Sequence, residues 1–367
     1  MASFNVMALD RNFNLVTPLA CTNLQWSRKY HESGTFSLQI PLSQYDSSFK
    51  YIYTKSRPET GKIVQVNYIR NNRQEFIQLS GYFLENELNR MVAFAKGSGN
   101  VVGDPEWTEN SGNAEDVAYN FFNAFSRVQF DDGNSTATFS LGINSESSLG
   151  RGSFAQHTRD NSYLGNKIYH ILKPSELSYK VMYSFEDNKM RFGVWAGKDR
   201  TSEQTENNPI VFSTRHNVKN PNVLLNTSTY KSGCVVVSSK NSGEESATYT
   251  RVLLDLDEQH EDNAFLSLQS QTNIDDFADL NEYYQVLDNE GRSEKNSNWI
   301  RTLNIEFDAL VGSYEYMQDF DIGDVCDLEI PEVNISASVR LIGCYEVIKN
   351  GSWSLTMEFG TPIIKNN

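Results

Sequence analysis

Short runs in which apolar and polar residues alternate, separated by turn-forming residues, dominate the chain. In the first ninety residues such runs occupy 24–27, 34–40, 62–69 and 75–82. A period of two places the apolar side chains on one face of an extended strand, and Gly, Asn and Pro commonly bound such strands. Residues 70–73 supply a hairpin connection, since Asn tolerates the positive φ of tight turns. The pattern predicts antiparallel strands and a small tube-like β-barrel over residues 1–95.

The centre of the chain has a different pattern. A break rich in Gly, Ser and Asn at 97–112 is followed by apolar residues at helical spacing, which predict a helix over 114–125. A second helix is expected over 162–172. Two alternating runs, 179–185 and 190–195, then flank a polar turn. A helix followed by a hairpin indicates an α+β domain, which we place at 96–205.

Strand patterning returns at 210–213 and 233–238, and again from 303 to the end of the chain. The late runs are 325–330, 337–342 and 354–359. Between them, residues 240–298 are polar and acidic and include a helical pattern at about 275–287. We therefore expect a second tube-like antiparallel β-barrel at 206–240 and 300–367, with an inserted α+β domain at 241–299. The predicted class is mainly β with α+β insertions: two barrels and two smaller α+β domains.

Composition excludes a disordered chain and bears on the partners. Hydrophobic residues make up 39% of the 367 residues, aromatic residues 12%, and only 9 prolines occur, so a folded chain of two to four domains is expected. The net charge of -15 argues against a phosphate-binding surface, because such surfaces are built from Lys and Arg. The acidic charge could instead serve solubility, or it could form a lining past which DNA moves without binding. The net charge alone does not distinguish between these two explanations.

The cysteines and the start of the chain indicate the compartment. Cys21, Cys234, Cys326 and Cys344 are scattered without a CxxC pair, which favours free thiols in a reducing cytoplasm over zinc or disulfides. The first ten residues lack a basic region, and Asp10 interrupts them, so no signal peptide is expected. No run of about 18 apolar residues exists, so no membrane span is expected.

Two segments have partial catalytic motifs. Residues 31–35 begin like a zinc-peptidase HExxH, but Thr35 stands where the second His is required and Gly34 disfavours the helix. Residues 193–199 resemble a phosphate-binding loop, but the spacing is one residue short and Asp199 replaces the magnesium-binding Ser or Thr. A turn between strands and a strand ending in a charged turn are the favoured interpretations.

The other candidate groups favour no site. The five histidines, His31, His157, His170, His216 and His260, are dispersed, and none accompanies a nucleophile motif. An acidic run could ligate calcium but lacks the Gly and the alternation of a calcium loop, so a solvated face is favoured. Its residues are Asp255, Asp257, Glu258, Glu261 and Asp262. We therefore assign no catalytic, cofactor-binding or metal-binding residue and expect no cofactor.

Three segments, in order along the chain, resemble one known family. They are 24–41, which contains Trp26, Gly34 and Pro41; 197–201 followed by 209–213; and 319–325 with the closing 358–360. Together they resemble the tail-hub family of siphophages that infect Gram-positive bacteria, whose members form the N-terminal part of tail-associated lysins and tip attachment proteins. The order and spacing of the segments span almost the whole chain.

The resemblance implies a structural role and no enzymatic activity. Members are expected to form a homotrimer in which two tube-like barrels per subunit give a pseudo-sixfold ring. Such a ring joins the hexameric tail tube and the distal tail protein to the threefold tip and surrounds the DNA passage. The implied partners also include the tape-measure protein and tip or receptor-binding proteins, and the implied location is the tip of the virion tail, assembled in the host cytoplasm.

One departure from the family pattern limits the expected activity. Many relatives continue into a lysin, peptidase or receptor-binding extension, whereas this sequence stops shortly after 360–362. Wall degradation and host binding are therefore expected in another protein.

Two alternatives from other classes remain open. A tail-associated glycosidase or peptidase would need paired carboxylates or a metal, and 47 acidic residues make such a pair easy to propose without favouring it. A carbohydrate-binding β module would use the many Tyr and Trp residues to stack on sugars, although most such aromatics lie in cores or interfaces.

Overall fold

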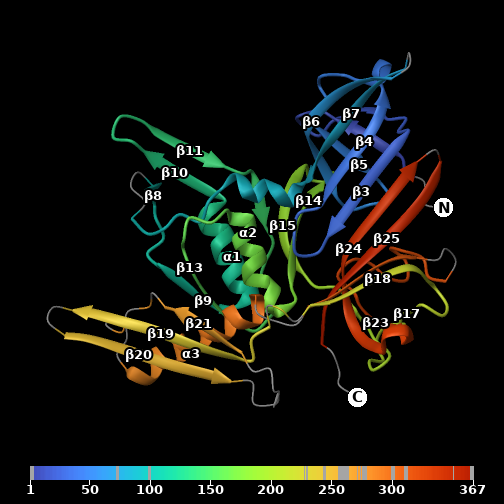
Figure 1. The fold of residues 1–367 in the computed structure, drawn as a ribbon. Coiled ribbons are helices and arrows are strands. Elements are labelled where there is room, and N and C mark those ends of the chain that lie inside the picture. Colours follow the sequence, from blue (N-terminus) through green and yellow to red (C-terminus); the bar gives the residue numbers. More distant parts are fainter. Residues whose placement is uncertain are drawn as a thin grey trace.

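A computed structural model gives the fold. It describes residues 4–71, 74–97, 101–226, 228, 230–242, 245–254, 264–270, 272, 274, 279–298, 302–309, 313–349 and 351–363. A large sheet occupies one side of the molecule, two helices lie in the centre, and a small sheet with one helix occupies the opposite side (Figure 1). In the large sheet, an N-terminal strand, Asn23–Lys29, lies beside a C-terminal strand, Ile335–Lys349. The fold is mainly β, as predicted.

The large sheet has 14 strands, and its main path is β18-β22-β25-β24-β3-β4-β7-β6-β5-β1-β2. Strands that follow one another on this path pair antiparallel, whereas β16 and β17 pair parallel to β23. We predicted only antiparallel pairing for these strands. The strands are β1 (Val6–Leu9), β2 (Leu15–Pro18), β3 (Asn23–Lys29), β4 (Thr35–Pro41), β5 (Tyr51–Thr54), β6 (Thr60–Asn71), β7 (Gln74–Phe83), β16 (Asp199–Arg200), β17 (Val211–Ser213), β18 (Val218–Asn226), β22 (Thr302–Ala309), β23 (Val325–Ile330), β24 (Ile335–Lys349) and β25 (Ser352–Ile363).

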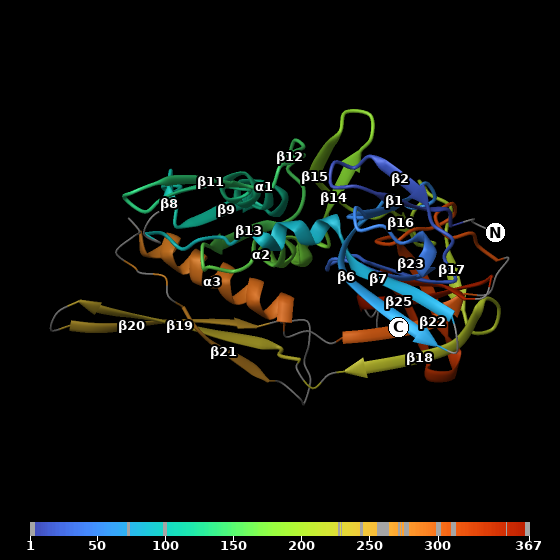
Figure 2. The ribbon, with the colours of Figure 1, turned by 90° about the horizontal axis from the view of Figure 1, so that it is seen from above.

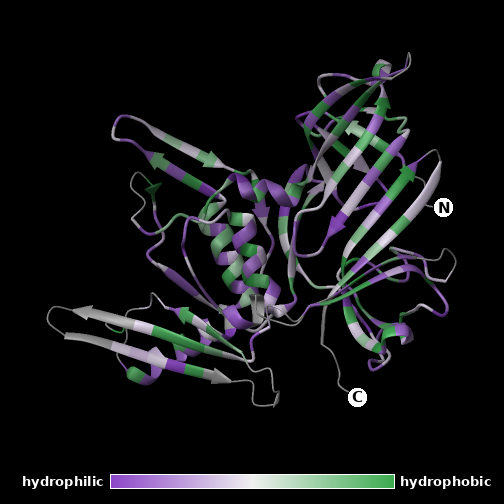
Figure 3. Ribbon diagram, viewed as in Figure 1, coloured by the Kyte–Doolittle hydropathy of each residue, from purple (hydrophilic) through white to green (hydrophobic). Residues whose placement is uncertain are grey.

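The alternation in the sequence gives this sheet one buried face. Figure 3 shows apolar and polar residues alternating along its strands. One hydrophobic cluster under the N-terminal strands includes Trp26, Phe36 and Phe83, and a second under the C-terminal strands includes Phe307 and Phe359. Burying each of these aromatic side chains contributes roughly 1.5–3 kcal/mol. The expected strands at 24–27, 34–40, 62–69 and 75–82 are confirmed, although residues 72–73 of the expected hairpin lie outside the described chain.

The two β units are joined into one sheet, where we expected two separate closed barrels. The first half of β24 pairs with β23, and its second half pairs with β3, with Gly343 opposite Lys29 and Lys349 opposite Asn23. No pairing in the described chain closes either half on itself. The 15-residue length of β24 is the cause, because it reaches past the predicted run at 337–342, through an irregularity between Leu341 and Gly343.

The central α+β region follows the expected order of elements. α1 (Ala114–Phe125), α2 (Leu164–Leu172) and the hairpin of β14 (Ser178–Ser184) and β15 (Lys189–Trp195) confirm the predicted helices and hairpin. Phe122 of α1 stacks on Phe192 of β15 with ring centroids 4.2 Å apart. Short strands surround this core: β8 (Val101–Val102), β9 (Glu109–Asn113), β10 (Arg127–Asp131), β11 (Thr136–Ser140), β12 (Ile143–Ser145) and β13 (Phe154–Thr158).

The third region is a three-stranded sheet covered on one face by a helix. Its strands are β20 (Glu245–Leu254), β19 (Gly233–Ser242) and β21 (Phe265–Gln269), and the helix is α3 (Leu280–Asn298). In Figure 2, α3 lies between this sheet and the central helices. The expected domain boundary at 240/241 falls inside β19. The predicted helix at 275–287 overlaps α3, which continues eleven residues further, through a polar segment without apolar periodicity; residues 275–278 lie outside the described chain.

All four cysteines are free. Cys234, Cys326 and Cys344 are buried, and Cys21 is half-buried. Within the described residues, no helix combines the length and the apolar character needed to cross a bilayer.

Candidate functional site

Eight neighbouring strands, from β18 to β6, present one polar face on the side away from the hydrophobic clusters. On the central strands of this run, side chains on this face alternate with buried ones, as Gln25 does with Leu24 and Trp26. Register pairs align them across strands, with Tyr345 opposite Ser27 and Ser27 opposite Thr35. We call this surface the polar face. It comprises Asn23, Gln25, Ser27, Lys29, Thr35, Ser37, Gln39, Gln65, Asn67, Gln78, Ser80, Asn222, Leu224, Asn304, Glu306, Asp308, Tyr345, Val347, Lys349, Ser354, Thr356 and Glu358.

Hydrogen bonds between strands satisfy many amides and hydroxyls of the polar face. Gln78 Nε2 donates to Ser37 Oγ at 2.9 Å, and Asn23 Nδ2 donates to Gln39 Oε1 at 2.7 Å. At the C-terminal end of the face, Thr356 Oγ1 donates to Asp308 Oδ1 at 2.7 Å. Such cross-strand pairs stabilise a sheet and fix its side chains.

The charge of the polar face is sparse and acidic. Glu306, Asp308 and Glu358 outnumber Lys29 and Lys349. Lys29 Nζ also lies 2.6 Å from a carboxylate oxygen of Glu32. Affinity for a nucleic-acid backbone comes from cations that neutralise phosphates. The polar face therefore offers hydration without strong attraction for phosphate.

The polar face is hollowed where the two halves of the sheet meet. A cavity of about 260 Å³ lies over β24, β3, β4 and β7. Its lining combines amides and hydroxyls with a few aliphatic side chains: Asn23, Leu24, Gln25, Ser37, Leu38, Gln39, Ile69, Gln78, Val347, Ile348 and Lys349.

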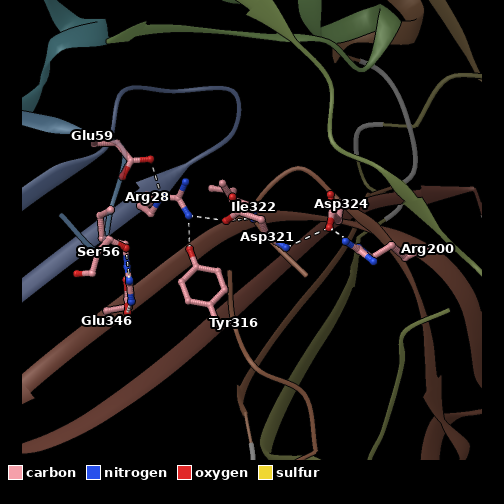
Figure 4. A network of polar contacts seen from close by, with 10 residues as sticks. Arg28, Ser56, Glu59, Arg200, Tyr316, Asp321, Ile322, Asp324 and Glu346 are labelled. Atoms are coloured by element: carbon pink, nitrogen blue, oxygen red, sulfur yellow. Dashed lines mark hydrogen bonds and ion pairs between the residues drawn. The ribbon is translucent and has the colours of Figure 1, made fainter. Parts of the chain in front are cut away.

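Behind the polar face, buried ion pairs connect the two halves of the sheet (Figure 4). Arg57, in the loop after β5, donates from Nε to Glu346 Oε2 of β24 at 2.6 Å and from Nη2 to Glu346 Oε1. Trp353 Nε1 donates to the same Oε1 at 3.0 Å. Arg57 is 5% exposed and Glu346 1%. A paired, desolvated carboxylate of this kind becomes costly as soon as its partner is removed.

Arg28 makes a second connection from β3. Its Nε lies 2.6 Å from Glu59 Oε1, and its Nη1 lies 2.5 Å from Asp321 Oδ1 and 2.6 Å from the hydroxyl of Tyr316 (Figure 4). Burial alone would lower the pKa of Arg28, but the charges of Glu59 and Asp321 outweigh it and raise the pKa well above the ordinary value. Arg28 therefore links the loop before β6 to the segment before β23.

Asp324 makes the third connection, to the strand that leaves the central region. It accepts hydrogen bonds from the backbone N–H of Lys198 and from Nε of Arg200, each at 2.7 Å. The backbones approach so closely here that a Cβ at Gly197 would lie 1.9 Å from the carbonyl of Gly323. Residues 193–199, which resemble a phosphate-binding loop in sequence, thus form part of a structural joint.

The three segments that carried the family resemblance meet at these contacts. Arg28 belongs to 24–41, Arg200 to 197–201, and Asp321 and Asp324 to 319–325. We predicted no individual roles for these segments, and no local pattern in the sequence indicated the Arg57–Glu346 pair. We refer to the contacts of Arg28, Arg57, Glu59, Arg200, Tyr316, Asp321, Asp324 and Glu346 as the joint.

A second cavity, of about 220 Å³, lies at the joint between the N-terminal strands and the central region. Glu85, 7% exposed, lines it and has one carboxylate oxygen without a hydrogen-bond partner. Burial, followed by the neighbouring charge of Glu59, raises the pKa of Glu85 to about 8. The Glu85 carboxyl is therefore largely protonated at neutral pH.

The residues of the partial zinc motif do not form a site. His31 lies in the turn between β3 and β4, where burial lowers its pKa to about 3. Glu32 is exposed and pairs with Lys29. Within the described residues, no group of three or more His, Cys, Asp or Glu side chains is placed to hold a metal ion. The acidic run at 255–262 lies outside the described residues.

The fold is similar to solved phage tail proteins. The 43 kDa tail protein of prophage MuSo2 from Shewanella oneidensis matches with a TM-score of 0.57 and 10% identity, over 97% of this chain and 98% of that chain. The prophage tail protein gp18 from Listeria monocytogenes EGD-e matches with a TM-score of 0.54 and 11% identity, over 96% and 94%. The tail protein from Neisseria meningitidis MC58 matches with a TM-score of 0.53 and 12% identity, over 98% and 97%.

Comparison at the level of sequence confirms the resemblance inferred from the three segments. No protein with a curated description matches the chain. The family model of the Siphovirus ReqiPepy6 Gp37-like proteins matches residues 5–361, nearly the whole chain, and the chain therefore belongs to this family of siphovirus tail proteins.

Proposed function

We propose that this protein is a structural, non-enzymatic hub of a phage tail tip, in which three copies form a ring around the DNA passage. The observation that carries the proposal is the run of eight antiparallel strands that unites both ends of the chain in one sheet. Four of these strands, β18, β22, β25 and β24, come from the C-terminal half, and β3, β4, β7 and β6 come from the N-terminal half. Three copies would therefore present six four-stranded halves, which suits a sixfold tube above and a threefold tip below.

The polar face has the character that a DNA passage requires. Its amides and hydroxyls are neutral, many are paired with one another, and its carboxylates outnumber its cations. The chain as a whole carries a net charge of -15. In the proposed ring the polar face lines the passage, and a moving duplex finds few cations to hold its phosphates.

The joint suits a ring that must keep its shape during assembly. Arg28, Arg57 and Asp324 tie the N-terminal half, the C-terminal half and the central region together through short, buried, charge-assisted contacts. Such contacts fix geometry more firmly than an apolar interface does. In the proposed assembly the joint holds the two halves of each subunit at the angle that the ring requires.

The central region and the small sheet extend away from the large sheet (Figure 1). Their outer surfaces are available to other tail components. In the proposed assembly the large sheet faces the tail tube and the distal tail protein, the tape-measure protein meets the passage, and tip or receptor-binding proteins attach to the outer regions.

The mass of the purified chain tests the proposal. Light scattering at several concentrations should give a species near three times 41.7 kDa, and negative-stain class averages of the same sample should show a threefold ring with a central channel. A chain that stays monomeric at every concentration and shows a deep cleft in the class averages would overturn the proposal, and a cell-wall degradation assay would then test the enzyme alternative.

A further inference from the structure

The cavity of about 220 Å³ beside the joint is lined by several buried polar atoms that have no hydrogen-bond partner. Within the described residues, Glu59 Oε2, Glu85 Oε2 and Trp195 Nε1 are such atoms, and all three residues line this cavity. Figure 4 shows Glu59 joined to Arg28 through its other carboxylate oxygen. Native proteins rarely leave buried polar atoms unpaired. Three of them around one cavity indicate that the cavity has an occupant.

The carboxyl groups make one side of the cavity acidic. Glu59 lies in the loop before β6, and Glu85, only 7% exposed, lies in the short 3-10 helix Leu84–Arg90 that follows β7. Asp321 lines the same cavity. Arg28 pairs with both Glu59 and Asp321, so one negative charge remains among these three side chains. Because ionised carboxylates only accept hydrogen bonds, an occupant on this side has to supply donors.

Aromatic side chains form another side of the cavity. Tyr169 of α2 and Tyr179 of β14 lie with ring centroids 4.1 Å apart, and Trp195 is the last residue of β15. Lys180 Nζ lies 5.8 Å from the centroid of the Trp195 ring, so this ring already has a cation beside it. Aromatic faces attract cations, and Arg side chains in particular stack on them. The cavity therefore combines carboxylates with rings that favour a flat organic cation.

The same residues suit a metal ion poorly. Calcium and zinc require several ligands arranged around one point. In the part of the chain that the structure describes, no group of three or more His, Cys, Asp or Glu side chains is placed to supply them. A guanidinium group needs fewer carboxylates, because its N–H groups point outward in a fixed fork and its plane packs on aromatic rings.

We propose that this cavity binds an alkylguanidinium group, whose N–H groups donate to Glu59 and Glu85 and whose plane packs against Trp195. The group belongs either to a free small molecule or to an Arg side chain of another protein, and the two sources share this chemistry. The inference depends on the fold of a single chain and goes beyond the proposed hub function, on which it does not rest.

Calorimetric titration of the full chain tests the proposal with butylguanidinium and with butylurea, a neutral molecule of nearly the same shape. The wild type should bind butylguanidinium about tenfold more tightly or better, because hydrogen bonds to a charged donor are stronger than those to a neutral one. Equal affinity for the two molecules would overturn the proposal, because the cavity would then select shape and not charge.

Three variants locate the binding. Glu85→Gln keeps the shape of the side chain and removes the carboxylate, so affinity for butylguanidinium should fall about tenfold or more. Lys180→Met removes the cation beside Trp195 and should increase the affinity. Glu75→Gln, in an exposed ion pair on β7, is the control and should bind as the wild type does. Circular dichroism establishes that each variant keeps the native fold.

Binding should also depend on pH. Burial and the charge of Glu59 raise the pKa of Glu85 to about 8, and the bound cation requires the ionised carboxylate. Below that pH the affinity of the wild type should therefore increase by up to about tenfold per pH unit, whereas Glu85→Gln should show no such increase. The other charged groups that line the cavity are Arg28, Lys29, Glu59, Lys180 and Asp321. Burial raises the pKa values of Tyr169 and Tyr179 well above the ordinary value, so both hydroxyls stay neutral in this range.

Two further probes identify the source of the group. Binding of both agmatine and N-acetyl-argininamide supports an Arg side chain of another protein, and binding of agmatine alone supports a free small molecule. Unchanged affinity in Glu85→Gln would overturn the proposal, and so would the absence of binding for every probe, which would leave water as the occupant. Neither result changes the mass expected for the ring, so failure of this inference leaves the proposed function standing.

Discussion

Arg57 and Glu346 lie 289 positions apart in the sequence, yet the guanidinium donates two hydrogen bonds to the carboxylate in the buried interior of the joint. The pair connects the loop after β5 to β24, the strand that merges the two halves of the large sheet. No local pattern in the sequence predicts this contact, although it connects the two halves of the sheet.

Removing one partner of this pair should destabilise the protein strongly. Arg57→Ala leaves Glu346 charged and buried without its cation, and we expect a loss of about 3–5 kcal/mol in the free energy of unfolding. The matched control is Arg70→Ala, because Arg70 and Glu75 form an exposed pair 3.9 Å apart and such pairs contribute within about 1 kcal/mol. Urea unfolding measures both variants. Similar small losses for the two would show that the joint does not hold the halves together.

Replacing both partners with apolar residues distinguishes charge pairing from packing. In Arg57→Met with Glu346→Leu no buried charge remains, so the loss should be much smaller than in Arg57→Ala. If the double variant is as unstable as the single one, the shape of the two side chains matters more than their charges.

Glu85 should make the stability depend on pH. Its folded-state pKa, raised to about 8 by burial and by Glu59, exceeds the ordinary glutamate value of 4.5. Between these values the folded chain binds more protons than the unfolded chain, so stability falls as the pH rises, by at most about 1.4 kcal/mol per pH unit. Glu85→Gln has no proton to lose. Its free energy of unfolding relative to wild type should therefore increase from pH 5 to pH 8.

Urea unfolding at pH 5, 6.5 and 8 measures this difference. Glu32→Gln is the control, because Glu32 is 69% exposed, and it should show no comparable trend. A constant difference between Glu85→Gln and wild type across this range would mean that Glu85 is ionised in the folded protein.

The thiols should be unreactive until the chain unfolds. Burial raises the pKa of Cys21 to about 11 and raises those of Cys326 and Cys344 further. Since the thiolate is the reactive species, a disulfide reagent at pH 8 should modify the native protein slowly and all four thiols in urea. Gln25→Cys, on the exposed part of the polar face, is the control and should react quickly. Rapid modification of the wild-type protein would indicate that the cores open readily.

The elements that the sequence predicted well are those with a strong local signal. α1 carries Val117, Phe121, Phe122 and Phe125 at helical spacing, and the predicted bounds 114–125 agree with the structure. The early strands alternate cleanly and were also predicted. β24 was predicted only at 337–342, because buried Gly343 and Cys344 interrupt the alternation that identifies a half-buried strand.

The pairings that build the candidate site had no such signal. The parallel contact of β17 with β23 joins segments more than one hundred positions apart, and so does the pairing of β3 with β24. The polar face consists of the polar residues that alternate with apolar ones. The alternation within each strand therefore predicted which of its residues would lie on this face. The assembly of these parts into one surface depends on strand order, which alternation does not specify.

Lysines placed on the polar face should make the assembly hold DNA. We expect the triple variant Gln25→Lys, Ser37→Lys and Gln78→Lys to bind a short linear DNA duplex more tightly than the wild type. A ring of three copies would place nine added cations along the passage. The logarithm of the affinity should fall steeply with the logarithm of the salt concentration, by about one unit of slope per phosphate neutralised. Fluorescence anisotropy over a salt series measures this slope.

The control is a triple variant that adds the same charge elsewhere, on the exposed strand β11: Thr136→Lys, Thr138→Lys and Ser140→Lys. Equal affinity and slope for the two triple variants would mean that net charge alone governs binding, and the polar face would then have no special access to DNA.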